Sequence, residues 1–138
     1  MRFTAQGTSM SPLIGEGDVV LIEPICSKLP KPSETVLFTN PQGSLVLHRV
    51  LKRWNKDDKV YYLLKGDQVA TPDGIYESAK IFGRLKAVER AGSILSLDKP
   101  AFKVLNWLAF LRSNTGLGSK GKLPALMMRN TIFSKYLD

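Results

Sequence analysis

Residues 44–65 read SLVLHRVLKRWNKDDKVYYLLK, in which two runs rich in Val, Leu and Tyr stand on either side of Lys56-Asp57-Asp58. β-branched and aromatic residues with period-two alternation are typical of strands, and a polar cluster between two such runs indicates a turn. The stretch therefore predicts strands at Ser44–Arg53 and Lys59–Lys65 that are joined by a close turn.

Similar short runs lie on both sides of this pair. They predict further strands at Val19–Glu23, Glu34–Thr39 and Lys80–Glu89, separated by Gly, Pro, Asn and Asp clusters such as those at 30–32, 40–43 and 72–74. Many short strands with close turns are typical of a strongly bent sheet. We expect a mainly β domain over residues 1–98, with a compact, bent-sheet, barrel-like fold.

The composition narrows the class of protein. The chain has 138 residues, of which 43% are hydrophobic and 23% charged, as in ordinary globular domains. One cysteine, Cys26, and one histidine, His48, cannot form an internal disulfide or a zinc site, so we expect no metal or cofactor. No leader or spanning segment is recognised, because the longest apolar stretch, residues 104–111, is short and contains Asn106. These features predict a cytoplasmic or peripherally membrane-associated protein.

The basic charge is concentrated at the end of the chain. Residues 1–98 hold 13 Lys/Arg and 11 Asp/Glu, whereas residues 99–138 hold 7 and 1. Apolar residues at helical spacing, among them Phe102, Trp107, Phe110 and Leu111, predict one helix, and residues 124–133 predict a second after a linker at 113–122. We expect 99–138 to be a basic amphipathic helical tail that contacts an anionic membrane surface or packs on the β core or in a dimer interface.

Three stretches carry side chains that could take part in catalysis. They are Gly7-Thr8-Ser9-Met10-Ser11-Pro12 with the later Gly17-Asp18, the strand containing His48, and the loop with Asp67 and Asp73 after the strand that ends in Lys65. Taken singly, each has a simple structural interpretation: a turn before a strand, a hydrogen-bonded core histidine on the face of Val46 and Val50, and an Asp-rich turn.

Together and in this order, the stretches resemble the signal peptidase and LexA-like serine peptidase superfamily over residues 5–88. Gly7-x-Ser9-Met10-x-Pro12 resembles the nucleophile motif, and Phe82-Gly83-Arg84-Leu85 is similar to the closing strand. His48-Arg49-Val50 is similar to the motif of the archaeal and endoplasmic-reticulum-type signal peptidases, which use a Ser-His pair. Lys65-Gly66-Asp67 with Asp73 resembles the later acidic motif. The chain shows neither the membrane anchors of signal peptidases nor the helix-turn-helix of LexA-like proteins.

The resemblance implies the LexA/signal-peptidase catalytic fold and a role for each residue. Ser9 is the nucleophile, His48 is the general base, and the backbone at Gly7, Ser9 and Met10 forms the oxyanion-binding loop. Asp73 is the first choice for the carboxylate that orients His48, and Asp67 is the second. Should His48 not be the base, Lys52 and Lys65 are the alternatives.

Three functions remain open from the sequence. The first is a serine endopeptidase that removes a leader or signal-like segment and binds its peptide substrate as an extended strand. The second is a self-processing or regulatory module, for which Ala91-Gly92 is the only Ala-Gly bond in the chain. The third is a non-catalytic membrane-surface binding protein. No specific nucleic-acid partner is expected, because no helix-turn-helix or basic-aromatic pattern accompanies the charge.

Overall fold

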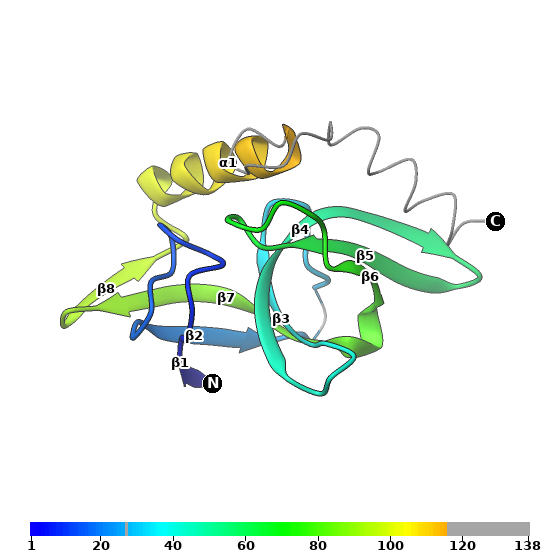
Figure 1. Ribbon diagram of the computed structural model, residues 1–138, viewed down its shortest axis with the longest axis horizontal. Helices are drawn as coiled ribbons and strands as arrows, with labels where there is room; N and C mark the ends of the chain where they lie inside the picture. Colours follow the sequence, from blue (N-terminus) through cyan, green and yellow to red (C-terminus); the bar gives the residue numbers. More distant parts are fainter. Residues whose placement is uncertain (27, 116–138) are drawn as a thin grey trace.

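A computed structural model describes residues 1–26 and 28–115, which form a curled antiparallel sheet and one long helix (Figure 1). The elements within these residues are β1 (Arg2–Thr4), β2 (Val19–Pro24), β3 (Thr35–Thr39), β4 (Leu45–Lys56), β5 (Lys59–Lys65), β6 (Gly74–Glu77), a short 3-10 turn η1 (Ser78–Lys80), β7 (Ile81–Arg90), β8 (Ser93–Ser96) and α1 (Pro100–Thr115).

The strands are joined in the order β1-β2-β7-β3-β4-β5-β6, and β8 pairs with β7. Strand β7 is central to this arrangement, because it pairs with β2, β3 and β8. A Cβ atom at Gly83 in β7 would lie 2.5 Å from Ile22 Cγ2 and 2.6 Å from Glu23 O. A residue without a side chain is therefore required where β2 and β7 approach each other.

Apolar side chains on the two faces of the sheet form two core clusters. Strand β3 separates them, since Leu37 belongs to the first, with Val20 and Val88, while Val36 and Phe38 belong to the second. Alternating residues of a strand point to opposite faces, so a strand that is apolar at every position is buried on both sides. The first cluster packs the loop between β1 and β2 against one face of β3, and the second packs β4 against the other face.

The predicted mainly β, bent-sheet fold is confirmed. The five expected strands are present, with ends that differ from the expectation by up to three residues. Three short strands were not predicted: β1, β6 and β8 have three or four residues each and pair with longer neighbours. Such short segments show too little alternation to be recognised without their partners.

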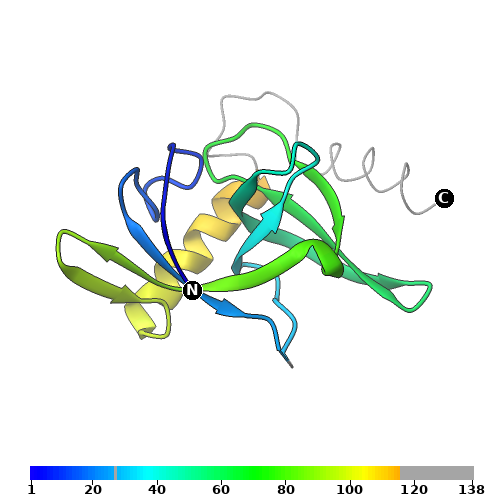
Figure 2. The same cartoon turned by 90° about the horizontal axis from the view of Figure 1, so that it is seen from below.

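Helix α1 runs across one end of the curled sheet, from the side of β8 to the side of β4 (Figures 1 and 2). It includes residues 113–115, which the sequence had assigned to the start of a linker, so that boundary was wrong. The remainder of that linker and the helix expected at 124–133 lie outside the described residues. In the described part of the chain, no helix is long and apolar enough to cross a membrane.

Candidate active site

Ser9 lies in the loop between β1 and β2. Backbone pairing closes this loop at its base, where Ala5 N donates a hydrogen bond of 2.8 Å to Asp18 O. Two apolar side chains of the loop, Met10 and Ile14, are only 3% and 4% exposed and belong to the first core cluster. Burial of Met10 therefore anchors its neighbour Ser9 at the edge of the core.

The loop is held from inside by the buried carboxylate of Asp18. Arg90 donates to it through Nη2 at 2.6 Å and through Nε at 3.0 Å. These hydrogen bonds lower the pKa of Asp18 from its ordinary value, against a desolvation effect that raises it. Asp18 is therefore an anion that stabilises the loop, and the Gly17-Asp18 part of the motif has a structural role.

His48 projects from β4 toward Ser9. Its ring is 6% exposed and lies in a tilted contact with Phe38, at 5.9 Å between ring centroids, on the face that carries Val46 and Val50. The Nε2 atom is 3.1 Å from Ser9 Oγ, which is hydrogen-bonding distance. The contact expected from the sequence is therefore present, across 39 positions of the chain.

Asp73 lies on the other side of the His48 ring, and its Oδ2 atom contacts Nδ1. The Asp73 backbone is held in place, because its N–H donates to Leu64 O at 2.8 Å. An ionised carboxylate only accepts hydrogen bonds, so the contact places the ring proton on Nδ1. Nε2 is then left with a lone pair that faces the Ser9 hydroxyl.

Residues 66–73 connect β5 to β6 and also contact the loop that carries Ser9. Gln68 N donates to Ser9 O at 2.9 Å, and the Gln68 side-chain amide donates to Ser11 O at 2.7 Å. The loop that carries Asp73 is thus hydrogen-bonded directly to the residue that carries the candidate nucleophile. One loop therefore sets the spacing of all three side chains.

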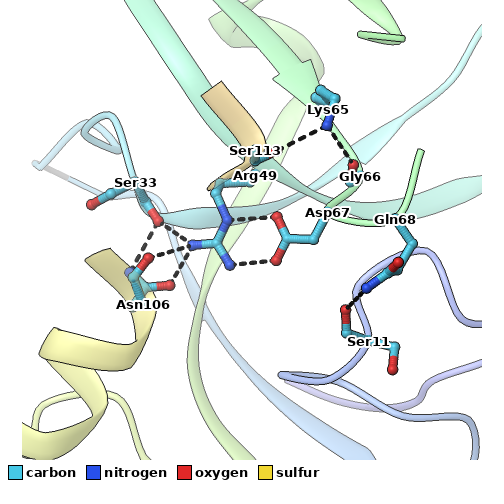
Figure 3. Close-up of polar contacts among 9 residues, drawn as sticks. All are labelled: Ser11, Ser33, Arg49, Lys65, Gly66, Asp67, Gln68, Asn106 and Ser113. Atoms are coloured by element: carbon cyan, nitrogen blue, oxygen red, sulfur yellow. Dashed lines mark hydrogen bonds and ion pairs between the residues drawn. The ribbon is translucent and has the colours of Figure 1, made fainter. Parts of the chain in front are cut away.

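Asp67, the second choice for the orienting carboxylate, occupies a different position. Its two oxygens accept hydrogen bonds from Arg49 Nε at 2.7 Å and Arg49 Nη2 at 2.6 Å (Figure 3). Arg49 is 0% exposed and Asp67 is 3% exposed, and a buried cation requires such a partner. The alternative assignment of Asp67 to His48 is therefore corrected. Asp73 contacts the His48 ring, and Asp67 neutralises Arg49, the residue that follows His48 in the sequence.

The two lysines named as alternative bases differ in environment. Lys52 is half-buried on β4. Lys65 is 3% exposed, and its Nζ donates to Ser113 Oγ at 3.1 Å and Gly66 O at 3.4 Å. Desolvation lowers the pKa of Lys65, and the nearby Asp67 carboxylate partly offsets this effect. Of the candidate bases, His48 is the one with a contact to Ser9.

A cavity of about 260 Å³ opens beside Ser9. Its walls include the three residues that were expected to form the oxyanion-binding loop, Gly7, Ser9 and Met10, together with apolar residues from β1, β2, β3 and β4. Gly7 has a φ of 81°, a conformation that glycine adopts without strain. The described residues that line this cavity include no charged side chain, and the backbone of the loop that carries Ser9 forms part of its wall.

Sequence reasoning did not recognise Gly66 as a site residue. A Cβ atom at this position would lie 2.8 Å from His48 Nε2 and 3.2 Å from His48 Cδ2. The absence of a side chain therefore leaves room for the imidazole edge that faces Ser9. The only signal in the sequence was the glycine within Lys65-Gly66-Asp67.

No protein-family model matches the chain, and no curated protein matches it either. Within residues 1–26 and 28–115, no group of three or more His, Cys, Asp or Glu side chains is arranged to hold a metal ion.

Proposed function

We propose that the chain is a serine endopeptidase that cleaves a leader or signal-like segment from a peptide or protein. The observation that carries this proposal is the hydrogen-bonded series from Ser9 through His48 to Asp73 beside a cavity. A serine hydroxyl is a weak nucleophile near neutral pH and needs an adjacent base, which is the relation of His48 to Ser9.

In the proposed reaction, Ser9 Oγ attacks the substrate carbonyl carbon and transfers its proton to His48 Nε2. Asp73 stabilises the imidazolium through Nδ1–H, and backbone N–H groups at Ser9 and Met10 stabilise the negative carbonyl oxygen. His48 then donates the proton to the leaving amine as the peptide bond breaks. Water attacks the acyl-enzyme by the same route in reverse, which restores Ser9.

The shape of the cavity supports binding of an extended substrate. Residues 3–7, at the end of β1, line one side, and residues 45–47, at the start of β4, line another. Among residues 1–26 and 28–115, β1 is the terminal strand of the sheet and pairs only with β2, so its other edge is available to a further strand. An extended peptide on that edge would gain main-chain hydrogen bonds and present its scissile carbonyl to Ser9.

A fluorogenic peptide library tests the proposal. The parental protein should hydrolyse a subset of peptides, and Ser9→Ala and His48→Ala should each remove this activity without loss of the fold, with no further loss in the double variant. Ser11→Ala, a matched change in the same loop, should retain it. A serine-directed phosphonate should add one adduct to Ser9, as located by mass spectrometry. Hydrolysis that survives Ser9→Ala would exclude Ser9 as the nucleophile.

Self-cleavage at Ala91-Gly92 has weaker support. These two residues form the turn between β7 and β8, with positive φ values of 51° and 79°. Peptidases of the proposed kind bind their substrates extended, and a tight turn does not present a bond in this form. We therefore propose cleavage of a separate chain.

We also propose that the outer face of α1 holds the peptidase at an anionic membrane surface. Four neighbouring apolar side chains on this helix are more than half exposed: Val104 at 59%, Leu105 at 56%, Trp107 at 52% and Leu108 at 55%. Lys99 and Lys103 are also exposed, and the segment 99–115 contains no acidic residue. An apolar helix face with adjacent lysines complements a bilayer of anionic lipids, where each lysine contributes about 1 kcal/mol at low salt.

The sequence had named Phe102, Trp107, Phe110 and Leu111 as the membrane-facing residues. Phe102 and Phe110 are half-buried, so they contribute less than expected, whereas Trp107 at 52% and Leu111 at 39% are exposed. Val104, Leu105 and Leu108 were not named as membrane-facing residues. The helix packs on the sheet with a side other than the one that carries these three apolar residues.

Flotation of the full chain with phosphatidylcholine vesicles, with and without phosphatidylglycerol, tests membrane binding. The parental protein should float with the anionic vesicles and dissociate as salt rises. Leu105→Gln with Leu108→Gln should abolish flotation, whereas Ile94→Gln, a matched change on β8 at a site 58% exposed, should not. Equal flotation of all variants would contradict the proposal, as would a dimer in solution that only the α1 variant dissociates.

A further inference from the structure

The face of α1 that contacts the sheet carries polar residues at its centre and end. Asn106 is half-buried and Ser113 is 2% exposed, while the large apolar residues Val104, Leu105 and Leu108 point away from the protein. A helix that packs on its own core ordinarily buries its apolar stripe. The polar residues of α1 must therefore have specific partners in the body of the protein.

The partner of Asn106 is Arg49, the residue that follows His48 in β4. Arg49 Nη1 donates to Asn106 Oδ1 and, at 2.8 Å, to Ser33 O (Figure 3). Asn106 Nδ2 donates to the same Ser33 carbonyl at 3.0 Å. Nε and Nη2 of Arg49 donate hydrogen bonds to Asp67. The fully buried guanidinium therefore has acceptors on two sides, the Asp67 carboxylate and Asn106 of α1.

The backbone of Ser33, which accepts hydrogen bonds from Arg49 and Asn106, has an unfavourable conformation. Its φ is 82°, a left-handed conformation that is unfavourable for a residue other than glycine. The Ser33 N–H donates to Val50 O at 2.9 Å, and its carbonyl accepts from both Arg49 and Asn106. Backbone in such a conformation persists where the surrounding contacts over-determine it, and this occurs often at functional sites.

Ser113 provides a second contact between α1 and the site. Its Oγ accepts from Lys65 Nζ at 3.1 Å, and Lys65 Nζ also donates to Gly66 O at 3.4 Å. Gly66 is the residue whose missing side chain leaves room for the edge of the His48 ring. Both buried cations next to the site, Arg49 and Lys65, therefore have a hydrogen-bond partner on α1.

From these contacts we propose that Asn106 is a positioning residue, which acts through Arg49 and Asp67 to hold His48 in line with Ser9. Arg49 is adjacent to His48 in β4, and Asp67 belongs to the loop that carries Asp73. Loss of the Asn106 side-chain acceptor leaves Arg49 Nη1 with Ser33 O and, at 3.4 Å, with the Asn106 backbone carbonyl. We expect the buried guanidinium to shift toward that more distant acceptor. Such a movement shifts the β4 backbone next to His48 and, through Asp67, the loop that carries Asp73.

This inference rests on the proposed peptidase function, so the experiment has one readout that depends on activity and one that does not. His48 is the only histidine of the chain, so its ring signals are identified without assignment of the whole spectrum. The proton on Nδ1, when it is hydrogen-bonded to a carboxylate, gives a far-downfield NMR signal. That signal reports the contact between His48 and Asp73 directly, whereas peptide hydrolysis reports its consequence.

The variants are Asn106→Ala, Asn106→Asp and, as a matched control, Asn55→Ala at an exposed position of β4. Asn106→Ala should lower kcat by about 10- to 100-fold with little change in KM, which is the range typical for residues that orient a functional histidine. It should also weaken or remove the downfield signal while circular dichroism shows an intact fold. Asn106→Asp keeps the acceptor for Arg49 but replaces the donor to Ser33 O with a second acceptor, so it should restore kcat and the downfield signal only in part. The control should change neither.

Parental kcat and an unchanged downfield signal in Asn106→Ala would overturn the positioning role. If Asn106→Ala does not fold, Asn106→Ser replaces it, because the shorter hydroxyl keeps a polar group near Arg49 without reaching the same point. A parental protein that hydrolyses no peptide, but whose His48 signal depends on Asn106, would overturn the peptidase proposal and leave the positioning role standing.

Discussion

Gly66→Ala tests the geometry of the site most directly, because it adds a single methyl group next to His48. The new Cβ would lie 2.8 Å from His48 Nε2 and 2.9 Å from Val69 Cγ2. Non-bonded carbon contacts are optimal at about 3.5–4.0 Å, so the ring must move by about 0.7 Å or more. Gly66 is not among the glycines with positive φ, so the backbone itself accepts alanine.

The displaced ring separates His48 Nε2 from Ser9 Oγ. A movement of that size away from Gly66 can extend the present 3.1 Å contact to nearly 4 Å, beyond hydrogen-bonding distance. Loss of a positioned general base typically lowers the rate by about 10²–10⁴-fold. The packing cost is about 1–3 kcal/mol of unfolding free energy, because a methyl group enters a filled space.

Peptide hydrolysis and thermal unfolding together measure these effects. Gly15→Ala is the matched control, because its Cβ would meet Arg90 Nη2 at 3.5 Å and Asp18 Oδ2 at 3.6 Å, which are ordinary contacts. It should retain activity and stability. A folded Gly66→Ala protein with parental kcat would refute the view that Gly66 leaves room for the working position of His48.

Three further predictions concern the neighbouring contacts. Asp73→Asn should lower kcat by up to about 10⁴-fold, as measured by peptide hydrolysis, because an amide no longer selects the His48 tautomer with its proton on Nδ1. Arg90→Gln should lower Tm at neutral pH, and the gap from the parental protein should narrow as pH falls through the depressed pKa of Asp18, since the stability that this carboxylate contributes is present above its ordinary value of 3.8 and is lost on protonation. A gap in Tm that stays constant to low pH would contradict that assignment. Ser33→Gly should be more stable in urea unfolding than Ser33→Ala by about 1 kcal/mol, because only glycine adopts the φ of 82° without strain.

The sequence by itself determined the main strands and the nature of the candidate nucleophile and base. Alternation and turn residues are local properties, so β2, β3, β4, β5 and β7 were recognisable from runs of five to twelve residues. The short strands β1, β6 and β8 were not, because a segment of three or four residues becomes a strand through its partner. Ser9 and His48 were identified because the chain has one histidine and a motif around one serine.

Only the tertiary structure decided which carboxylate meets His48 and what α1 contributes. Asp67 and Asp73 lie in one loop, and no local pattern separates a residue that pairs with Arg49 from one that contacts the imidazole. Asn106 stood out in the sequence only as an interruption of an apolar stretch, yet it contacts a buried arginine 57 positions away. The physical reason is that a buried charge takes whichever partner the folded chain brings to it, so these choices depend on long-range closure of the sheet and helix.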